Sequence, residues 1–135
     1  MTAITAPATT TRDSFLRFAL RLDAVVSGLM GVVGLAIAPH IADLSGTTTS
    51  FEYAMGAFFV AYGAAVLILS SRPSVRLTGR ACAIGNVVYS VATVIMVLAD
   101  VFPLTTTGIV ATLGSGVFTL VMADLQYLGL RRLKG

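Results

Sequence analysis

Three polar residues stand out in an otherwise apolar chain as groups that could do chemistry: Asp23, Asn86 and Asp124. Each lies six or seven residues from an arginine that flanks an apolar segment. That spacing is about 9–10 Å along a helix that rises about 1.5 Å per residue. Three helices would then each contribute a polar group at a common depth. Ionisable groups inside a membrane are candidates for binding protons or polar ligands, so this polar layer is the candidate site.

Four further side chains could extend the polar layer: Ser27, Tyr89, Ser90 and Tyr127. Ser27 shares with Asp23 a face of small residues, which we expect to pack inward because small residues let helices approach closely in lipid. The layer could be structural, since hydrogen bonds between helices fix their register at roughly 0.6–2 kcal/mol each. It could equally be a ligand or proton site, and the residue types leave both interpretations open.

The composition places these residues in a membrane protein. Of the 135 residues, 56% are hydrophobic and only 11% are charged, and the mean hydropathy is +0.91. A typical soluble domain carries about 25% charged residues. A soluble domain of this size also keeps much of its surface in water, where so many apolar side chains could not be hidden. The chain is therefore predicted to be one domain embedded in lipid.

Four apolar segments of helical length predict an all-α, four-helix transmembrane bundle with short loops. The expected helices span about residues 14–38, 50–71, 80–99 and 106–130. Residues 1–12 are rich in Thr and Ala and are expected to form a disordered tail, with the transmembrane domain over 13–135. Residues 40–50 are expected to be a loop, after which Thr49 and Glu52 have the spacing of a capping box.

The distribution of charge predicts the orientation. All nine Lys and Arg residues lie before the first helix's apolar part, between the second and third helices, or after the fourth. Positively charged flanks stay on the cytoplasmic side, so both termini are expected there (N-in/C-in). Eight of the nine are Arg, a bias typical of bacteria with GC-rich genomes. The expected location is the inner or plasma membrane of a bacterial cell.

A weak internal repeat relates the two halves of the chain. The matching positions are Arg17 with Arg80, Asp23 with Asn86, and Ser27 with Ser90. Either the helices form two hairpins related by a parallel repeat, or these few identities are a coincidence. The sequence does not decide between the two.

No catalytic, metal or cofactor motif is present. The single cysteine, Cys82, excludes an internal disulfide and any site built from several cysteines. His40 is the only histidine, and it is expected across the membrane from the polar layer. There is no H-E-x-x-H sequence and no P-loop. We therefore expect no enzymatic activity and no cofactor.

The expected function is that of a non-enzymatic membrane protein that acts by packing, as an accessory or scaffold subunit or as a homo-oligomer. Rows of small residues such as Ala57, Ala61 and Ala65 favour helix association in lipid. The alternative is a small proton-coupled transporter, or a binder of lipophilic ligands, that uses the polar layer. The expected partners are the lipid bilayer and another membrane protein or a second copy, and not nucleic acid.

Three stretches carry a resemblance to a known group of proteins: LRFALRLDAVVSG near the start, GNVVYS in the third helix and DLQYLGLRR at the end. With them the chain resembles a family of small bacterial four-helix membrane proteins without an assigned function. This resemblance implies four helices and supplies no activity. The chain departs from small multidrug resistance transporters, whose first-helix acid is a deeply placed Glu and whose charge bias is usually weak.

Overall fold

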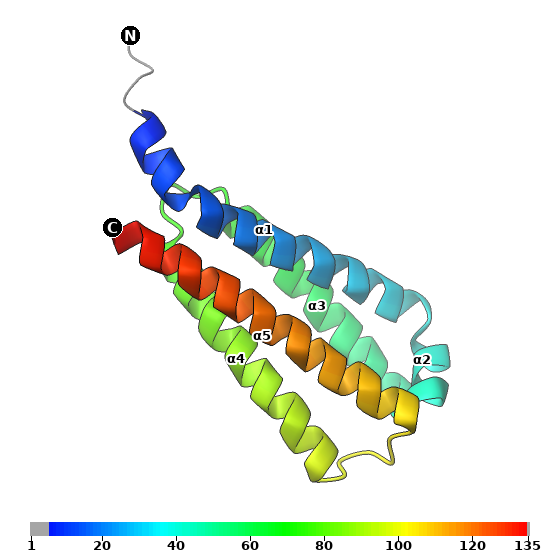
Figure 1. Cartoon of the computed structure of the whole chain (residues 1–135). Helices are drawn as coiled ribbons and strands as arrows, with labels where there is room; N and C mark the ends of the chain where they lie inside the picture. The colour runs from blue at the N-terminus through cyan, green and yellow to red at the C-terminus, as the bar shows by residue number, and fades with distance from the viewer. Residues whose placement is uncertain (1–5, 135) are drawn as a thin grey trace.

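The structure is a computed structural model that describes the backbone of residues 6–134 and the side chains of residues 13–133. The helices are α1 (Ala6–Ala36), α2 (Ala38–Ser45), α3 (Thr49–Leu69), α4 (Arg76–Leu98) and α5 (Thr106–Lys134). The four long helices are each apolar enough to cross a membrane, and they form a bundle (Figure 1). The predicted all-α, four-helix fold is confirmed.

The bundle has two distinct ends. The start of α1, the end of α5 and the connection from α3 to α4 lie at one end, and α2 lies at the other (Figure 1). All nine Lys and Arg residues lie in segments 12–21, 72–80 and 131–134, and these segments are found at the first of the two ends. We call it the arginine end, and the other the α2 end.

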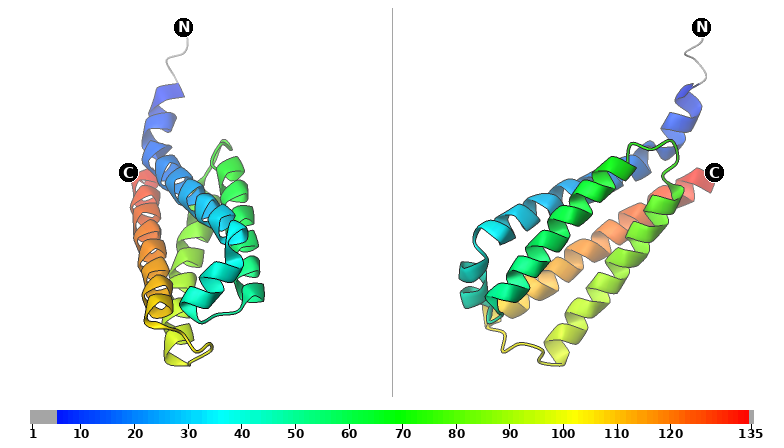
Figure 2. Two further views of the ribbon diagram at one scale, coloured as in Figure 1. Left: turned by 90° about the vertical axis from the view of Figure 1, so that its right-hand side faces the viewer. Right: turned by 180° about the vertical axis from the view of Figure 1, so that it is seen from behind.

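The helices pair as two hairpins with unequal packing between them. α1 packs along α3, α4 packs along α5, and α1 also packs along α5. The backbones of α3 and α4 stay apart, and these two helices meet only through side chains such as Phe59 and Tyr89. The separation of α3 from α4 is visible in two directions (Figure 2). An exact repeat would pack α3 on α4 as closely as α1 on α5. The two hairpins are therefore present, but one side of the bundle is open.

Glycines bring α1 and α3 into backbone contact. A Cβ atom at Gly63 would lie 2.6 Å from the carbonyl oxygen of Ala24, and one at Gly31 would lie 2.7 Å from the backbone nitrogen of Val60. The small face of the first helix thus packs inward, as expected. On α3, the alanines at 57, 61 and 65 are exposed, so its glycines and not its alanines make the helix contact.

Two segments expected to be irregular are helical. Residues 6–12, expected to belong to a disordered tail, form the first turns of α1, because extending an existing helix costs far less than nucleating a new one. Residues 1–5 of that tail lie outside the described residues. The expected loop over 40–50 is mostly α2, where Pro39 occupies the first turn, a position that needs no N–H donor. Gly46, with φ of 82°, then ends α2.

Two helix starts differ from the prediction. The N-cap of α3 is Thr48, whose hydroxyl accepts from the Phe51 backbone N–H at 3.1 Å, while Glu52 accepts from the Thr47 hydroxyl. The expected N-cap was Thr49. Residues 47–49 are all threonine, so residue type alone does not show which of them caps the helix. The third helix was expected from about residue 80, but α4 begins at Arg76. Gly79 therefore lies inside α4, where a Cβ atom would be 3.0 Å from the Leu16 side chain.

Arginines of α1 stabilise the end of α3. Arg17 donates to the carbonyl oxygens of Ser70, Arg72 and Pro73 at 2.7–2.9 Å, and Arg21 donates to the Ser70 hydroxyl at 3.2 Å. The last carbonyls of a helix lack partners within the helix, so cationic donors there complement the helix dipole. These two guanidinium groups are thus used at the arginine end and do not neutralise Asp23.

Candidate functional site

The carboxylate of Asp23 lies at the centre of a hydrogen-bonded cluster to which all four long helices contribute. Asp23 is completely buried. Its Oδ2 atom accepts from the Tyr62 hydroxyl at 2.7 Å and from the side-chain amides of Asn86 and Gln126 at 2.9 Å each. Its Oδ1 atom accepts from the Ser27 hydroxyl at 3.1 Å. We call these five residues the Asp23 cluster.

The members of the cluster also bind one another. Asn86 donates to the Gln126 side-chain oxygen at 3.1 Å, so the two amides bind each other as well as Asp23. Both carboxyl oxygens of Asp23 have partners: three donors meet at Oδ2 and one reaches Oδ1. The cluster therefore links the four long helices without an arginine or lysine side chain in it.

The structure brings together three of the seven residues expected in the polar layer: Asp23, Ser27 and Asn86. The expectation that Asp124 joins them is wrong, because Asp124 is exposed on the outside of the bundle. Gln126 takes its place, and it is completely buried. Two residues along a helix turn the side chain by about 200°, so Asp124 and Gln126 cannot both face inward.

The other expected members lie outside the cluster. The Tyr89 hydroxyl bonds that of Ser115 at 3.1 Å, which links α4 to α5 toward the α2 end. Ser90 is half-buried, and its carbonyl oxygen accepts from the Thr93 hydroxyl at 2.7 Å. Tyr127 is exposed, and its ring lies 5.9 Å below the guanidinium carbon of Arg131.

Sequence reasoning missed Tyr62 and Gln126, although each left a signal. Tyr62 is the only side chain with a polar group between residues 54 and 69, so it alone could reach the cluster from the middle of α3. On α5, Thr119 and Gln126 are seven residues apart and both are buried. Residues seven apart lie on one face of a helix. Thr119 and Gln126 therefore mark the inward face of α5, and Asp124 does not lie on that face.

The hydrogen bonds within the Asp23 cluster favour the structural interpretation of the polar layer. Each of the four long helices presents a polar group to one point, so a shift of any helix by one residue would break at least one hydrogen bond. The cavities of about 380, 590 and 740 Å³ are not lined by any residue of the cluster. Among the residues described, no three His, Cys, Asp or Glu side chains gather as metal ligands would.

A cavity of about 380 Å³ lies in the open side of the bundle, toward the α2 end. Its walls combine aromatic rings and methionines with several hydroxyl groups and one carboxylate. Phe51, Met55, Phe59 and Met96 are among the apolar residues, and Glu52, Tyr89, Thr93, Thr112 and Ser115 are among the polar ones. Apolar walls with a few convergent polar groups are typical of small-molecule sites.

Comparisons with known proteins add nothing to this geometry. No family model, no curated protein and no solved structure matches the chain. The resemblance to small four-helix bacterial membrane proteins therefore stays a prediction, and the function must be inferred from the site itself.

Proposed function

We propose that this chain is a non-enzymatic, multi-pass membrane protein that binds a lipophilic molecule in the cavity between α3, α4 and α5. The observation that carries the proposal is the gap between the backbones of α3 and α4, where a cavity lies among helices that are long and apolar enough to cross a membrane. The Asp23 cluster supports the proposal indirectly, because it joins all four long helices about one helical turn from the cavity and so fixes the position of the cavity walls. The binding site is thus separate from the polar layer predicted from the sequence.

The charge of the cavity favours a lipophilic molecule that carries a positive charge. Glu52 is the only charged residue that lines it, and no Lys or Arg lies in segments 37–55 or 92–112 near the α2 end. The rings of Phe59 and Tyr89 are 5.8 Å apart at its wall. Aromatic faces attract cations, by up to about 2 kcal/mol or more when water is excluded.

Binding of tetraphenylphosphonium to the protein in nanodiscs tests the proposal. Ala92 is exposed and lines the cavity, so Ala92→Phe should fill the cavity without disturbing the fold. We expect binding to weaken by at least about tenfold, or about 1.4 kcal/mol, measured by titration calorimetry. Glu52→Gln should also weaken binding, because it removes the charge and keeps hydrogen-bonding capacity.

The matched control is Ala57→Phe, which adds the same ring at an exposed position of α3 outside the cavity. It should bind the probe as the unmodified protein does. Equal binding by the Ala92→Phe and Ala57→Phe proteins would show that the probe partitions into lipid, and the proposed site would be wrong.

The orientation we propose has both termini in the cytoplasm of a bacterial cell, supported by the segregation of all nine Lys and Arg residues to the arginine end. Thr48 and Ser74 are exposed at opposite ends of the bundle, and the native Cys82 is buried. In intact cells, a membrane-impermeant maleimide should label a Thr48→Cys protein and not a Ser74→Cys protein. The reverse pattern would contradict the orientation.

Association with a second copy or an accessory partner is the second candidate function. It is favoured by the exposed alanines of α3 at positions 54, 57, 61, 64 and 65, because small residues let another helix approach closely in lipid. Native mass spectrometry from nanodiscs should then show a dimer or a co-purifying membrane protein. A uniformly monomeric protein would count against this candidate.

A further inference from the structure

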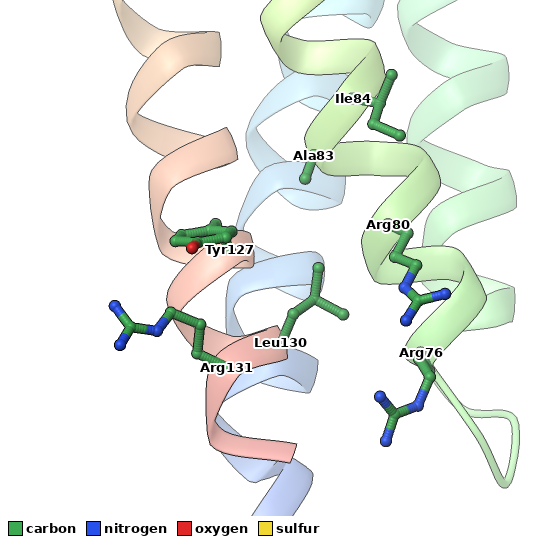
Figure 3. Close-up of a pocket in the computed structure, with 7 residues that line it drawn as sticks. All are labelled: Arg76, Arg80, Ala83, Ile84, Tyr127, Leu130 and Arg131. Carbon is green, nitrogen blue, oxygen red and sulfur yellow. The ribbon is translucent and has the colours of Figure 1, made fainter. Parts of the chain in front are cut away.

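A basic groove lies between α4 and α5 at the arginine end, away from the cavity of the proposed function. It has a volume of about 590 Å³ and is lined by Arg76, Arg80, Ala83, Ile84, Tyr127, Leu130 and Arg131. Arg76 and Arg80 project from α4 beside the gap to α5, whereas the Arg131 guanidinium group points away from them, on the other side of α5 (Figure 3). We call this the arginine groove.

The charges of the arginine groove are not neutralised by the protein. Arg76 and Arg80 are exposed. Neither makes a hydrogen bond or an ion pair within the part of the chain that the structure describes, where the one ion pair is that of Arg17 with Asp13. Arg131 has only the ring of Tyr127 beneath it. No acid lines the arginine groove. The guanidinium groups of Arg76 and Arg80, which are four residues apart on α4, therefore remain available to one anion.

An apolar groove of about 740 Å³ continues from the arginine groove along the outer face of α4 and α5. The two share Ala83, Ile84 and Tyr127 as lining residues. The deeper part is lined mainly by aliphatic side chains, among them Val87, Val88 and Leu120. Its one acid, Asp124, lines this apolar part and not the arginine groove.

We infer that the arginine and apolar grooves together bind one anionic phospholipid, with its phosphate at Arg76 and Arg80 and an acyl chain along Val87 and Val88. Basic pockets between transmembrane helices bind anionic headgroups, and Arg presents several donors in a fork that fits phosphate oxygens. The joined apolar groove selects a lipid over a free phosphate ion, because the ion would leave that surface unused.

The experiment measures dissociation constants by native mass spectrometry of the full chain in detergent. The probes are dioleoyl phosphatidylglycerol, dioleoyl phosphatidylcholine and inorganic phosphate. We expect the phosphatidylglycerol to bind more tightly than the phosphatidylcholine. Arg76→Gln and Arg80→Gln should each weaken phosphatidylglycerol binding roughly fivefold, the equivalent of about 1 kcal/mol for each arginine near a membrane surface, and the double variant should weaken it further.

Arg72→Gln is the matched control, since Arg72 is exposed at the same end and does not line the groove. It removes the same charge and should leave binding unchanged; an equal loss would mean general attraction to a basic surface and would overturn the proposal. The second variant, Val87→Trp, obstructs the apolar groove at a position that is 44% exposed.

Val87→Trp should weaken binding of the lipid, and unchanged lipid binding would overturn the placement of the acyl chain. Displacement of phosphatidylglycerol by inorganic phosphate at equal concentration would show that the arginines recognise the free ion, and would overturn the assignment to a lipid. Thermal melting of each variant confirms that the fold is retained. The tetraphenylphosphonium assay should be unaffected by all of these arginine variants, so this inference and the proposed function can fail independently.

Discussion

Asp23→Ala should strongly destabilise the protein, whereas Asp124→Ala should be tolerated. The same substitution removes a carboxylate in both cases, but Asp23 is completely buried among four donors and Asp124 is exposed. Without Asp23, the Tyr62 hydroxyl and the amides of Asn86 and Gln126 lose their shared acceptor. Buried donors left without partners cost about 1–3 kcal/mol each.

The expected loss of stability for Asp23→Ala is at least about 2 kcal/mol, since four hydrogen bonds are lost at a membrane average of about 0.6 kcal/mol each. The stability of the Asp23→Asn protein should lie between those of the Asp23→Ala and Asp124→Ala proteins, because the amide keeps one acceptor oxygen. Thermal or denaturant unfolding in a mild detergent, followed by circular dichroism, gives the ranking. Equal stability of the Asp23→Ala and Asp124→Ala proteins would contradict the role assigned to the Asp23 cluster.

Gly63→Val should separate α1 from α3, whereas Gly85→Val should not disturb the fold. A Cβ atom at Gly63 would lie 2.6 Å from the Ala24 carbonyl oxygen and 2.9 Å from the Gly28 Cα atom, and nothing lies within 4 Å of a Cβ atom at Gly85. The contacts at Gly63 are to backbone, which a rotamer change cannot relieve. Overpacking of this kind costs roughly 1–3 kcal/mol or more.

Tyr62 gives the Gly63→Val prediction a second measurement. Tyr62 precedes Gly63 and donates to Asp23 at 2.7 Å, so a displaced α3 should withdraw this hydroxyl from the cluster. We expect lower thermal stability together with a changed tyrosine fluorescence or ultraviolet spectrum for Gly63→Val, and neither change for Gly85→Val. A Gly63→Val protein that melts like the unmodified one would show that α1 and α3 do not pack through their glycines.

The cavity and the Asp23 cluster are physically connected through these helices. α3 supplies Tyr62 to the cluster and Phe59 to the cavity wall, and α4 supplies Asn86 to the cluster and Tyr89 to the cavity wall. The residues of each pair are three apart, about one helical turn. Variants that loosen the cluster should therefore weaken tetraphenylphosphonium binding as a secondary effect, whereas Ala92→Phe should weaken it without lowering stability.

Composition and residue spacing were enough to predict the class of the protein, its four long helices and the depth of the polar groups along them. These properties follow from composition and from counting residues, because a helix rises by a constant amount per residue. On that basis Asp23 and Asn86 were expected at one depth, and they bond at 2.9 Å. Close packing along the small face of α1 was also predictable, since Gly28, Gly31 and Gly34 recur there.

Residue spacing did not show which face of each helix points inward or which helices touch, because both depend on how the helices pack in three dimensions. Asp124 and Gln126 lie at similar depths, and the packing of α5 against α1 and α4 turned Gln126 inward and left Asp124 outside. In lipid the hydrophobic pattern is a weak guide to the inward face, because the surroundings are as apolar as the interior. The face, the open side between α3 and α4, and both proposed binding sites therefore depend on contacts between helices distant in sequence.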